Sequence, residues 1–164
     1  MIPLLKQIKS ASAGNNMDKC QYCDRDERFK SLFFEVCELT VSTVFLCKDQ
    51  TLPGRCTIMY KDHINELYQI PEDKREQYIK DICALEEALM EIFHPDKLNM
   101  AYYGDKCNHV HFTICPKYED KLGWGEAFFT FPPEEERVFL TDAQYKQRIE
   151  QIKSIVLEKR LCSG

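Results

Sequence analysis

The strongest structural signal in the sequence is a long helical segment at residues 71–93. Pro71 and Glu72 suit the first turn of a helix, and Pro95 ends the pattern. Between them, apolar side chains recur at helical spacing: Tyr78, Ile82, Leu85, Leu89 and Ile92. Strand-type segments precede and follow this helix in the chain. That order predicts an α+β domain built on an antiparallel sheet.

The strand-type segments are rich in β-branched and aromatic residues. Residues 31–47 are typical of two short strands with a turn, and "CTIMYKDHI" (56–64) of another strand that runs into a turn. "LNMAYYG" (98–104) and "HVHFTIC" (109–115) indicate two adjacent strands. Residues 48–55 lie between strands and contain a Pro-Gly pair, which predicts a loop.

A second helix is predicted near the end of the sequence, at residues 141–161. Thr141 is a plausible N-cap. The helix has an apolar stripe made of Tyr145, Ile149, Ile152 and Val156. Two other stretches show no regular pattern: residues 20–30 are polar and charged, and residues 117–136 are irregular and aromatic.

Composition narrows the class of protein. A chain of 164 residues with 44% hydrophobic and 30% charged residues is typical of one soluble globular domain. No apolar run approaches the roughly 20 residues that span a bilayer, so we expect no membrane association. The net charge of −5 argues against nucleic acid as the main ligand. It does not argue against a small anionic ligand, which responds to local charges.

The cysteines and the first residues bear on the cellular compartment. Nine cysteines without a compact framework or a secretory signal predict reduced thiols and a cytoplasmic protein. Residues 1–16 contain two lysines and no acidic residue. We expect them to be a poorly ordered extension before a single domain at 17–164, with a transit peptide as the alternative.

The pair Cys20 and Cys23 in "CQYC" has three possible interpretations. The two thiols could be ordinary loop residues. They could form a redox pair, but no thioredoxin-like strand and helix surround them. They could also bind zinc, which needs two further ligands, and His63 and His109 are candidates because each lies at a strand or a turn.

Two of the four histidines, His109 and His111, lie two residues apart in a predicted strand. A strand directs residues i and i+2 to the same face, so both imidazoles should point the same way. A single buried imidazole is most simply satisfied by backbone hydrogen bonds, but two on one face suggest a metal ligand, an acid, a base or a nucleophile. Thr113 and Asn108 offer a hydroxyl and an amide nearby, which could stabilise a phosphate.

These motifs resemble those of the histidine triad (HIT) nucleotidyl hydrolases and transferases, over roughly residues 20–118. The family motif is His-φ-His-φ-His-φ-φ, with φ apolar, and "HVHFTIC" carries its first two histidines. "CQYC" is similar to a Cys-x-x-Cys of many bacterial members. "LPGRCTIMYKDHI" and "KLNMAYYGD" match two strands of the family, and "CPKY" with a later "WG" is like a clostridial-type subgroup. The order and spacing of the motifs make the resemblance specific.

The resemblance implies a metal site and a nucleophile. One structural zinc ion per chain would be held by Cys20, Cys23, His63 and His109. His111 would attack the α-phosphorus of a nucleotide, form a nucleotidyl-histidine intermediate and pass the nucleotide to water or phosphate. The implied substrates are purine nucleoside phosphoramidates, dinucleoside polyphosphates or related conjugates. The implied fold is a HIT-like antiparallel sheet of about five strands with one long helix and a C-terminal helix.

The resemblance also assigns residues to substrate binding. Asn99 matches an asparagine that helps to hold the nucleotide and its phosphate, and Asn108 lies where family loops present polar groups. Asp49 is the candidate for a ribose-binding acid that members usually carry near the position of Cys47. Trp124 could pack on a base, on a partner subunit or on the protein surface. Many members are homodimers, so a homodimer is expected.

The chain departs from the family at the third motif position, where Thr113 replaces histidine. Other branches carry glutamine there and remain active, so a side chain that donates a hydrogen bond can suffice. Threonine is shorter, and we expect reduced or altered activity, with Asn108 and Thr113 assisting His111. The alternative is a zinc-stabilised nucleotide-binding protein with little or no catalysis, because the loss of a transition-state donor costs roughly 100- to 1000-fold in rate.

Overall fold

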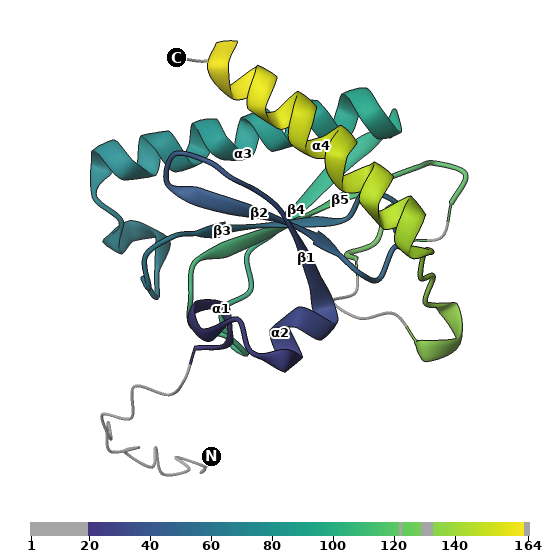
Figure 1. Ribbon diagram of the computed structural model, residues 1–164, viewed down its shortest axis with the longest axis horizontal. Coiled ribbons are helices and arrows are strands. Elements are labelled where there is room, and N and C mark those ends of the chain that lie inside the picture. Colours follow the sequence, from purple (N-terminus) through teal and green to yellow (C-terminus); the bar gives the residue numbers. More distant parts are fainter. Residues whose placement is uncertain (1–19, 122, 129–132, 163–164) are drawn as a thin grey trace, which may run out of the picture.

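A computed structural model describes residues 20–121, 123–128 and 133–162 of the chain (Figure 1). Its five strands are β1 (Phe33–Glu38), β2 (Ser42–Cys47), β3 (Cys56–Tyr60), β4 (Lys97–Ala101) and β5 (His111–Lys117). Its helices are α1 (Gln21–Asp24), α2 (Glu27–Leu32), α3 (Glu72–Phe93) and α4 (Asp142–Cys162), with 3-10 turns η1 (Leu67–Gln69) and η2 (Glu134–Glu136). The extension expected at residues 1–16 lies outside the described residues.

The strands form one sheet in the order β1-β2-β3-β5-β4, and every neighbouring pair is antiparallel. The long helices α3 and α4 lie on one side of the sheet, and the short helices α1 and α2 lie on the other (Figure 1). This arrangement confirms the predicted α+β fold with an antiparallel sheet, one long helix and a C-terminal helix. No described helix is long and apolar enough to cross a membrane.

The long helix α3 forms where the periodicity predicts it. It runs from Glu72 to Phe93, with Pro71 as its N-cap and His94 as a left-handed C-cap at φ 47°. Tyr78, Leu85 and Leu89 of its apolar stripe are completely buried. Because this face packs on the sheet together with α4, it forms the larger hydrophobic core, to which β2, β3 and β5 also contribute.

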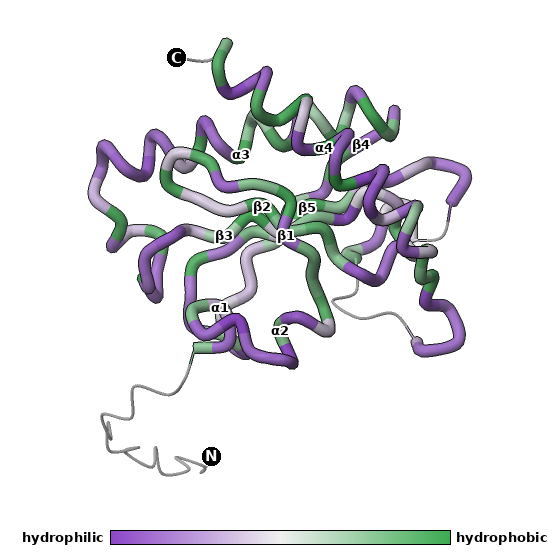
Figure 2. Tube along the Cα trace, viewed as in Figure 1, coloured by the Kyte–Doolittle hydropathy of each residue, from purple (hydrophilic) through white to green (hydrophobic). Residues whose placement is uncertain are grey.

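The opposite face of the sheet has a second, smaller apolar cluster. Tyr22 of α1 and Phe29 of α2 pack there against Phe45 and Met59 of the sheet. Figure 2 shows hydrophobic residues concentrated in the central strands and hydrophilic ones in much of α2 and the outer loops. Since α1 and α2 are short, they cover only part of this face, which leaves room for a cavity.

Two local details differ from the sequence predictions. The polar segment 20–30 contains α1 and most of α2, and α2 begins where the Asp26 side chain accepts a hydrogen bond from the backbone N–H of Phe29 at 2.9 Å. Helices of four and six residues are too short to show an apolar period. The strand predicted at 109–115 is shifted and begins at His111.

Candidate active site and metal centre

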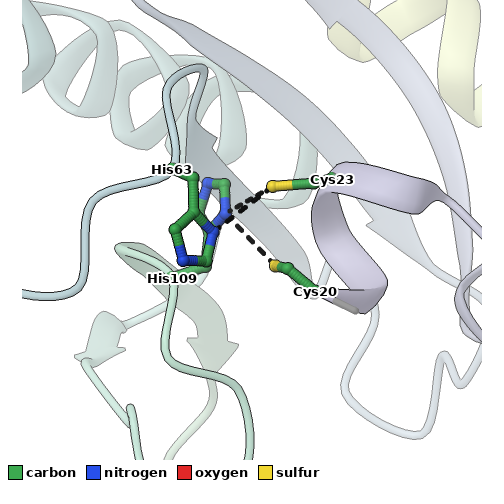
Figure 3. A group of neighbouring side chains, drawn as sticks. All are labelled: Cys20, Cys23, His63 and His109. Atoms are coloured by element: carbon green, nitrogen blue, oxygen red, sulfur yellow. Dashed lines mark hydrogen bonds between the residues drawn. The ribbon is translucent and has the colours of Figure 1, made fainter. Parts of the chain in front are cut away.

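Four side chains from three separate segments meet at one end of the sheet. Cys20 is the N-cap of α1 and Cys23 lies within that helix, His63 comes from the loop after β3, and His109 from the residues just before β5 (Figure 3). Their ligand atoms all lie within 4.8 Å of one another. The Sγ of Cys23 lies 3.4 Å from Nδ1 of both histidines, and the Sγ of Cys20 lies 3.5 Å from Nδ1 of His109.

The three sulfur–nitrogen separations of 3.4–3.5 Å match those of a tetrahedral zinc site. Zinc with sulfur at about 2.3 Å and nitrogen at about 2.0 Å keeps its ligand atoms roughly 3.3–3.8 Å apart. The Nε2–H of His109 donates to the carbonyl oxygen of Tyr60 at 2.7 Å, so its Nδ1 lone pair faces the cysteines. Burial also lowers the pKa of His109. The four residues are therefore compatible with one zinc ion.

A third thiol, that of Cys107, adjoins this cluster. Its Sγ lies 3.9 Å from the Sγ of Cys20. Burial raises the pKa of Cys107 to about 12 and that of Cys23 to about 11. A metal cation reverses such shifts, because a coordinated thiol loses its proton.

His111 lies on β5 next to the cluster, and its ring has one hydrogen bond and one close aromatic contact. Its Nδ1–H donates to the carbonyl oxygen of His109 at 2.7 Å, which leaves the lone pair on Nε2. The ring of Tyr22 packs against it with 4.7 Å between centroids. Burial lowers the pKa of His111, which favours the neutral ring. A neutral, rigidly held imidazole with a free nitrogen is the form that acts as a nucleophile.

A cavity of about 730 Å³ opens beside His111 on this face of the sheet. Thr113 shares its wall with Thr57 of β3, and their hydroxyl oxygens lie 3.2 Å apart. Aromatic side chains form much of the remaining wall: Tyr22, Phe33, Tyr103, Phe128 and Phe139. Among the described residues, five cations line it as well: Arg28, Lys48, Arg55, Lys106 and Arg137. Two described acids do so, Asp49 and Asp105, so this part of the wall is cationic in a chain of net charge −5.

Asp49 lies in the cavity wall next to the end of β2. Its Oδ1 accepts hydrogen bonds from the backbone N–H of Thr51 at 3.0 Å and from the Thr51 hydroxyl at 2.6 Å. Its Oδ2 is buried without a hydrogen-bond partner among the described residues.

The other predicted binding residues lie outside this cavity. Asn99 is on β4 and pairs with Cys115, which lies two residues after Thr113 on β5. Asn99 therefore faces the same side of the sheet as Thr113. Asn108 is exposed and lines a second depression, next to Cys20 and Cys23. Trp124 is 40% exposed. Within the described part of the chain, the structure therefore brings together His111, Thr113 and Asp49, but not these three residues.

Several residues of the site were missed by sequence reasoning. Tyr22 lies inside the quoted "CQYC", but its contact with His111 depends on how α1 packs on the sheet. Arg55 belongs to a motif that matched the family, yet it received no role. Thr57 stands on the neighbouring strand, and only the β3–β5 register places it opposite Thr113. The sequence offered one signal for Arg55: it is a charged residue that directly precedes the apolar segment of β3.

Sequence comparison relates part of the chain to a known protein. No family model matches the chain. A curated relative, "Protein hit" of Bacillus subtilis (strain 168), is 28% identical over 91 residues, which cover 52% of this chain and 63% of that protein. The match thus spans less than two thirds of the relative.

Solved structures of histidine triad proteins superpose on most of the chain. One from Marinobacter aquaeolei VT8 has a TM-score of 0.72 at 22% identity and covers 81% of this chain and 95% of its own. A Zn-bound histidine triad family protein from Mycobacterium smegmatis has a TM-score of 0.58 at 15% identity, covering 85% and 94%. The Plasmodium falciparum diadenosine triphosphate hydrolase has a TM-score of 0.54 at 14% identity, covering 77% and 78%. The chain has the bacterial-type histidine triad fold.

Proposed function

We propose that this chain is a histidine triad nucleotidyl hydrolase or transferase that acts on the α-phosphate of purine nucleotide conjugates. The observation that carries the proposal is the orientation of His111. Its Nδ1–H is committed to the carbonyl oxygen of His109, and the ring lines the cavity. The aromatic and cationic wall of that cavity suits a base and a phosphate. The hydrolase among the similar structures supports this reaction class.

In the proposed reaction, Nε2 of His111 attacks the α-phosphorus. The bond from phosphorus to the leaving oxygen or nitrogen breaks, and the leaving group takes its electron pair and a proton from water. Water or phosphate then attacks the same phosphorus, and the bond to Nε2 breaks. The attacking group gives its proton to solvent. The product, a nucleoside monophosphate after attack by water or a nucleoside diphosphate after attack by phosphate, leaves, and His111 returns to its neutral form. Purine nucleoside phosphoramidates and dinucleoside polyphosphates both fit this scheme.

The metal site has a structural role in this proposal. Cys20, Cys23, His63 and His109 would hold one zinc ion, as their donor atoms and separations suit it. The ion would tie α1 and the loop after β3 to the start of β5. That tie stabilises a region where the hydrophobic cluster is small. The backbone of His109, which accepts from His111, is thereby fixed.

Covalent trapping tests the proposal. The purified chain is incubated with adenosine phosphoramidate, with diadenosine triphosphate or with diadenosine tetraphosphate, quenched, and measured by intact mass spectrometry. We expect an adenylylated species in the unmodified protein and none in His111→Ala. His94→Ala is the matched control, because His94 caps α3. Nucleotide binding without adduct or turnover at any pH would overturn the enzyme proposal.

A second candidate function follows from Thr113. Most family members have an imidazole at the position of Thr113. Here the Thr113 hydroxyl lies 3.2 Å from the hydroxyl of Thr57. A protein with this site could bind nucleotides without turning them over, stabilised by its zinc ion. The trapping experiment separates the two candidates, because a binding protein would show affinity for nucleotide but no adduct.

Assembly and location complete the proposal. We propose a homodimer, in keeping with the resemblance to the family. The outer strand β4 has a free edge in the described chain, and Met100 on it is 47% exposed. Sedimentation of the purified chain tests this, with a dimer mass expected.

We also propose a cytoplasmic protein, because its cysteines are free thiols.

A further inference from the structure

We infer that Arg55 binds the substrate phosphate and supplies the hydrogen-bond donor that the shorter Thr113 side chain does not. The inference rests on the proposed function and adds a phosphate-binding residue to it. Most members of the resembled family present a third imidazole at the position of Thr113. Here the hydroxyl of Thr113 is short and lies 3.2 Å from that of Thr57. A site that stabilises a phosphoryl transition state needs a strong donor, and Arg55 supplies one.

The register of the sheet brings Arg55 to this position. Thr57 of β3 pairs with Thr113 of β5, and Cys56 pairs with Ile114. Arg55 precedes Thr57 by two residues, so its side chain leaves the sheet on the same face. It lines the same cavity as His111 and Thr113.

The charge of Arg55 acts on buried groups around the cavity. Burial raises the pKa values of the Cys47 and Cys115 thiols, and the positive charge of Arg55 acts against this rise at both. Because Arg55, His111 and Thr113 line the same cavity, a phosphate that meets His111 there would lie within electrostatic range of the guanidinium.

Burial distinguishes Arg55 from the other cations of the cavity. It is 6% exposed, whereas Arg28, Lys48, Lys106 and Arg137 are half-buried or exposed. A cation away from bulk water interacts more strongly with an anion than one at the rim. Arginine also presents a planar fork that binds two phosphate oxygens at once.

The backbone around Arg55 is held firmly, so the side chain starts from a defined point. Its N–H donates to the carbonyl oxygen of Leu52 at 3.0 Å, and its carbonyl oxygen accepts from the backbone N–H of Cys47 at 3.1 Å. The guanidinium carbon lies 5.8 Å from the ring centroid of Phe128, which forms one side of its surroundings. Such positioning before binding lowers the entropic cost of holding the anion.

Calorimetry with two ligands that differ by one phosphate tests the inference. Adenosine monophosphate and adenosine are titrated into the zinc-loaded unmodified chain and into Arg55→Met. We expect the variant to lose at least about tenfold in affinity for the monophosphate, the range of a charged hydrogen-bond partner, with adenosine affinity retained. Arg75→Met is the matched control, since Arg75 lies at the start of α3 on the other side of the sheet.

The outcomes separate the inference from the proposed function. Unchanged monophosphate affinity in Arg55→Met, with the His111 adduct still formed, would overturn the inference and leave the proposed function standing. An unmodified chain that binds neither ligand would overturn both. If Arg55→Met unfolds at the assay temperature, Arg55→Lys decides. Arg55→Lys keeps the positive charge but not the planar guanidinium. A loss of affinity for the monophosphate but not for adenosine supports the inference, and unchanged affinity for the monophosphate overturns it.

Discussion

The Nδ1–H of His111 donates to the carbonyl oxygen of His109 at 2.7 Å, while the ring of His109 faces Cys20 and Cys23. One residue thus serves both halves of the site. Its side chain belongs to the metal cluster, and its backbone orients the neighbouring imidazole. Any loss of order at His109 would therefore change the orientation of His111, which links the proposed zinc site to the proposed reaction.

Removal of the metal should weaken both stability and reaction. We expect the purified chain to contain about one equivalent of zinc, and a strong chelator to lower its melting temperature and slow adduct formation. Cys20→Ser should reduce metal affinity by more than the roughly 10- to 100-fold typical of residues that only orient a ligand. Metal analysis and thermal unfolding provide the measurements.

Cys83→Ser is the control for this experiment, because Cys83 is an exposed cysteine of α3, outside the cluster. It should keep both the metal and the melting temperature. A full equivalent of zinc in Cys20→Ser would show that Cys20 is not a ligand.

Thr113→His should raise the rate of nucleotidyl transfer. The imidazole reaches farther into the cavity than the threonine hydroxyl and restores the donor that most family members carry. A donor of this kind is worth roughly 100- to 1000-fold in rate, so a gain of about tenfold or more is expected when Arg55 already supplies part of the effect. Single-turnover rates of adduct formation provide the measurement. An unchanged or lower rate would mean that the site has adapted to threonine.

Gly54→Ala should destabilise the chain and disturb Arg55, the next residue. Gly54 has φ +85°, and a Cβ built on it would lie 2.6 Å from ring carbons of Phe93. Strain of this kind costs about 1–3 kcal/mol in the free energy of unfolding. Gly104→Ala is the control, since a Cβ there meets nothing within 4 Å. Urea unfolding of both variants measures the difference, and equal stabilities would contradict the prediction.

Asp81→Ala should be strongly destabilising, although Asp81 lies far from the cavity in the fold. Its carboxylate is completely buried and accepts from Arg160 Nε at 2.5 Å, from the Ser42 hydroxyl at 2.8 Å and from the Val41 N–H at 3.1 Å. The loss of one member of such a buried pair costs about 3–5 kcal/mol. Thermal or urea unfolding measures it.

Glu91→Gln is the matched control on the same helix. It removes an exposed carboxylate that pairs with Lys159 at 2.8 Å, so unfolding should change little. If both variants unfolded alike, the buried network around Asp81 would not be the link between α3, α4 and β2 that its hydrogen bonds indicate.

Local patterns were enough to predict much of this protein. The spacing of Tyr78, Leu85 and Leu89 predicted α3, because a helix turns once in 3.6 residues and must bury one face. The four residues proposed as zinc ligands, Cys20, Cys23, His63 and His109, do converge in space. Their convergence could be expected because motif spacing and the resemblance together carried the long-range information that residue chemistry alone left open.

The composition of the cavity was decided by the tertiary structure. Arg55 and Thr113 are far apart in the chain, and nothing in their local sequence tells which residues face each other across β3 and β5. A shift of one residue in that pairing would turn Arg55 and Thr57 to the opposite face. Likewise, α1 and α2 carry too few residues for a helical period, so the contact of Tyr22 with His111 arises only from packing. Register and packing depend on the whole core. For this reason the sequence determined the elements and the candidate site residues, while the fold determined their neighbours.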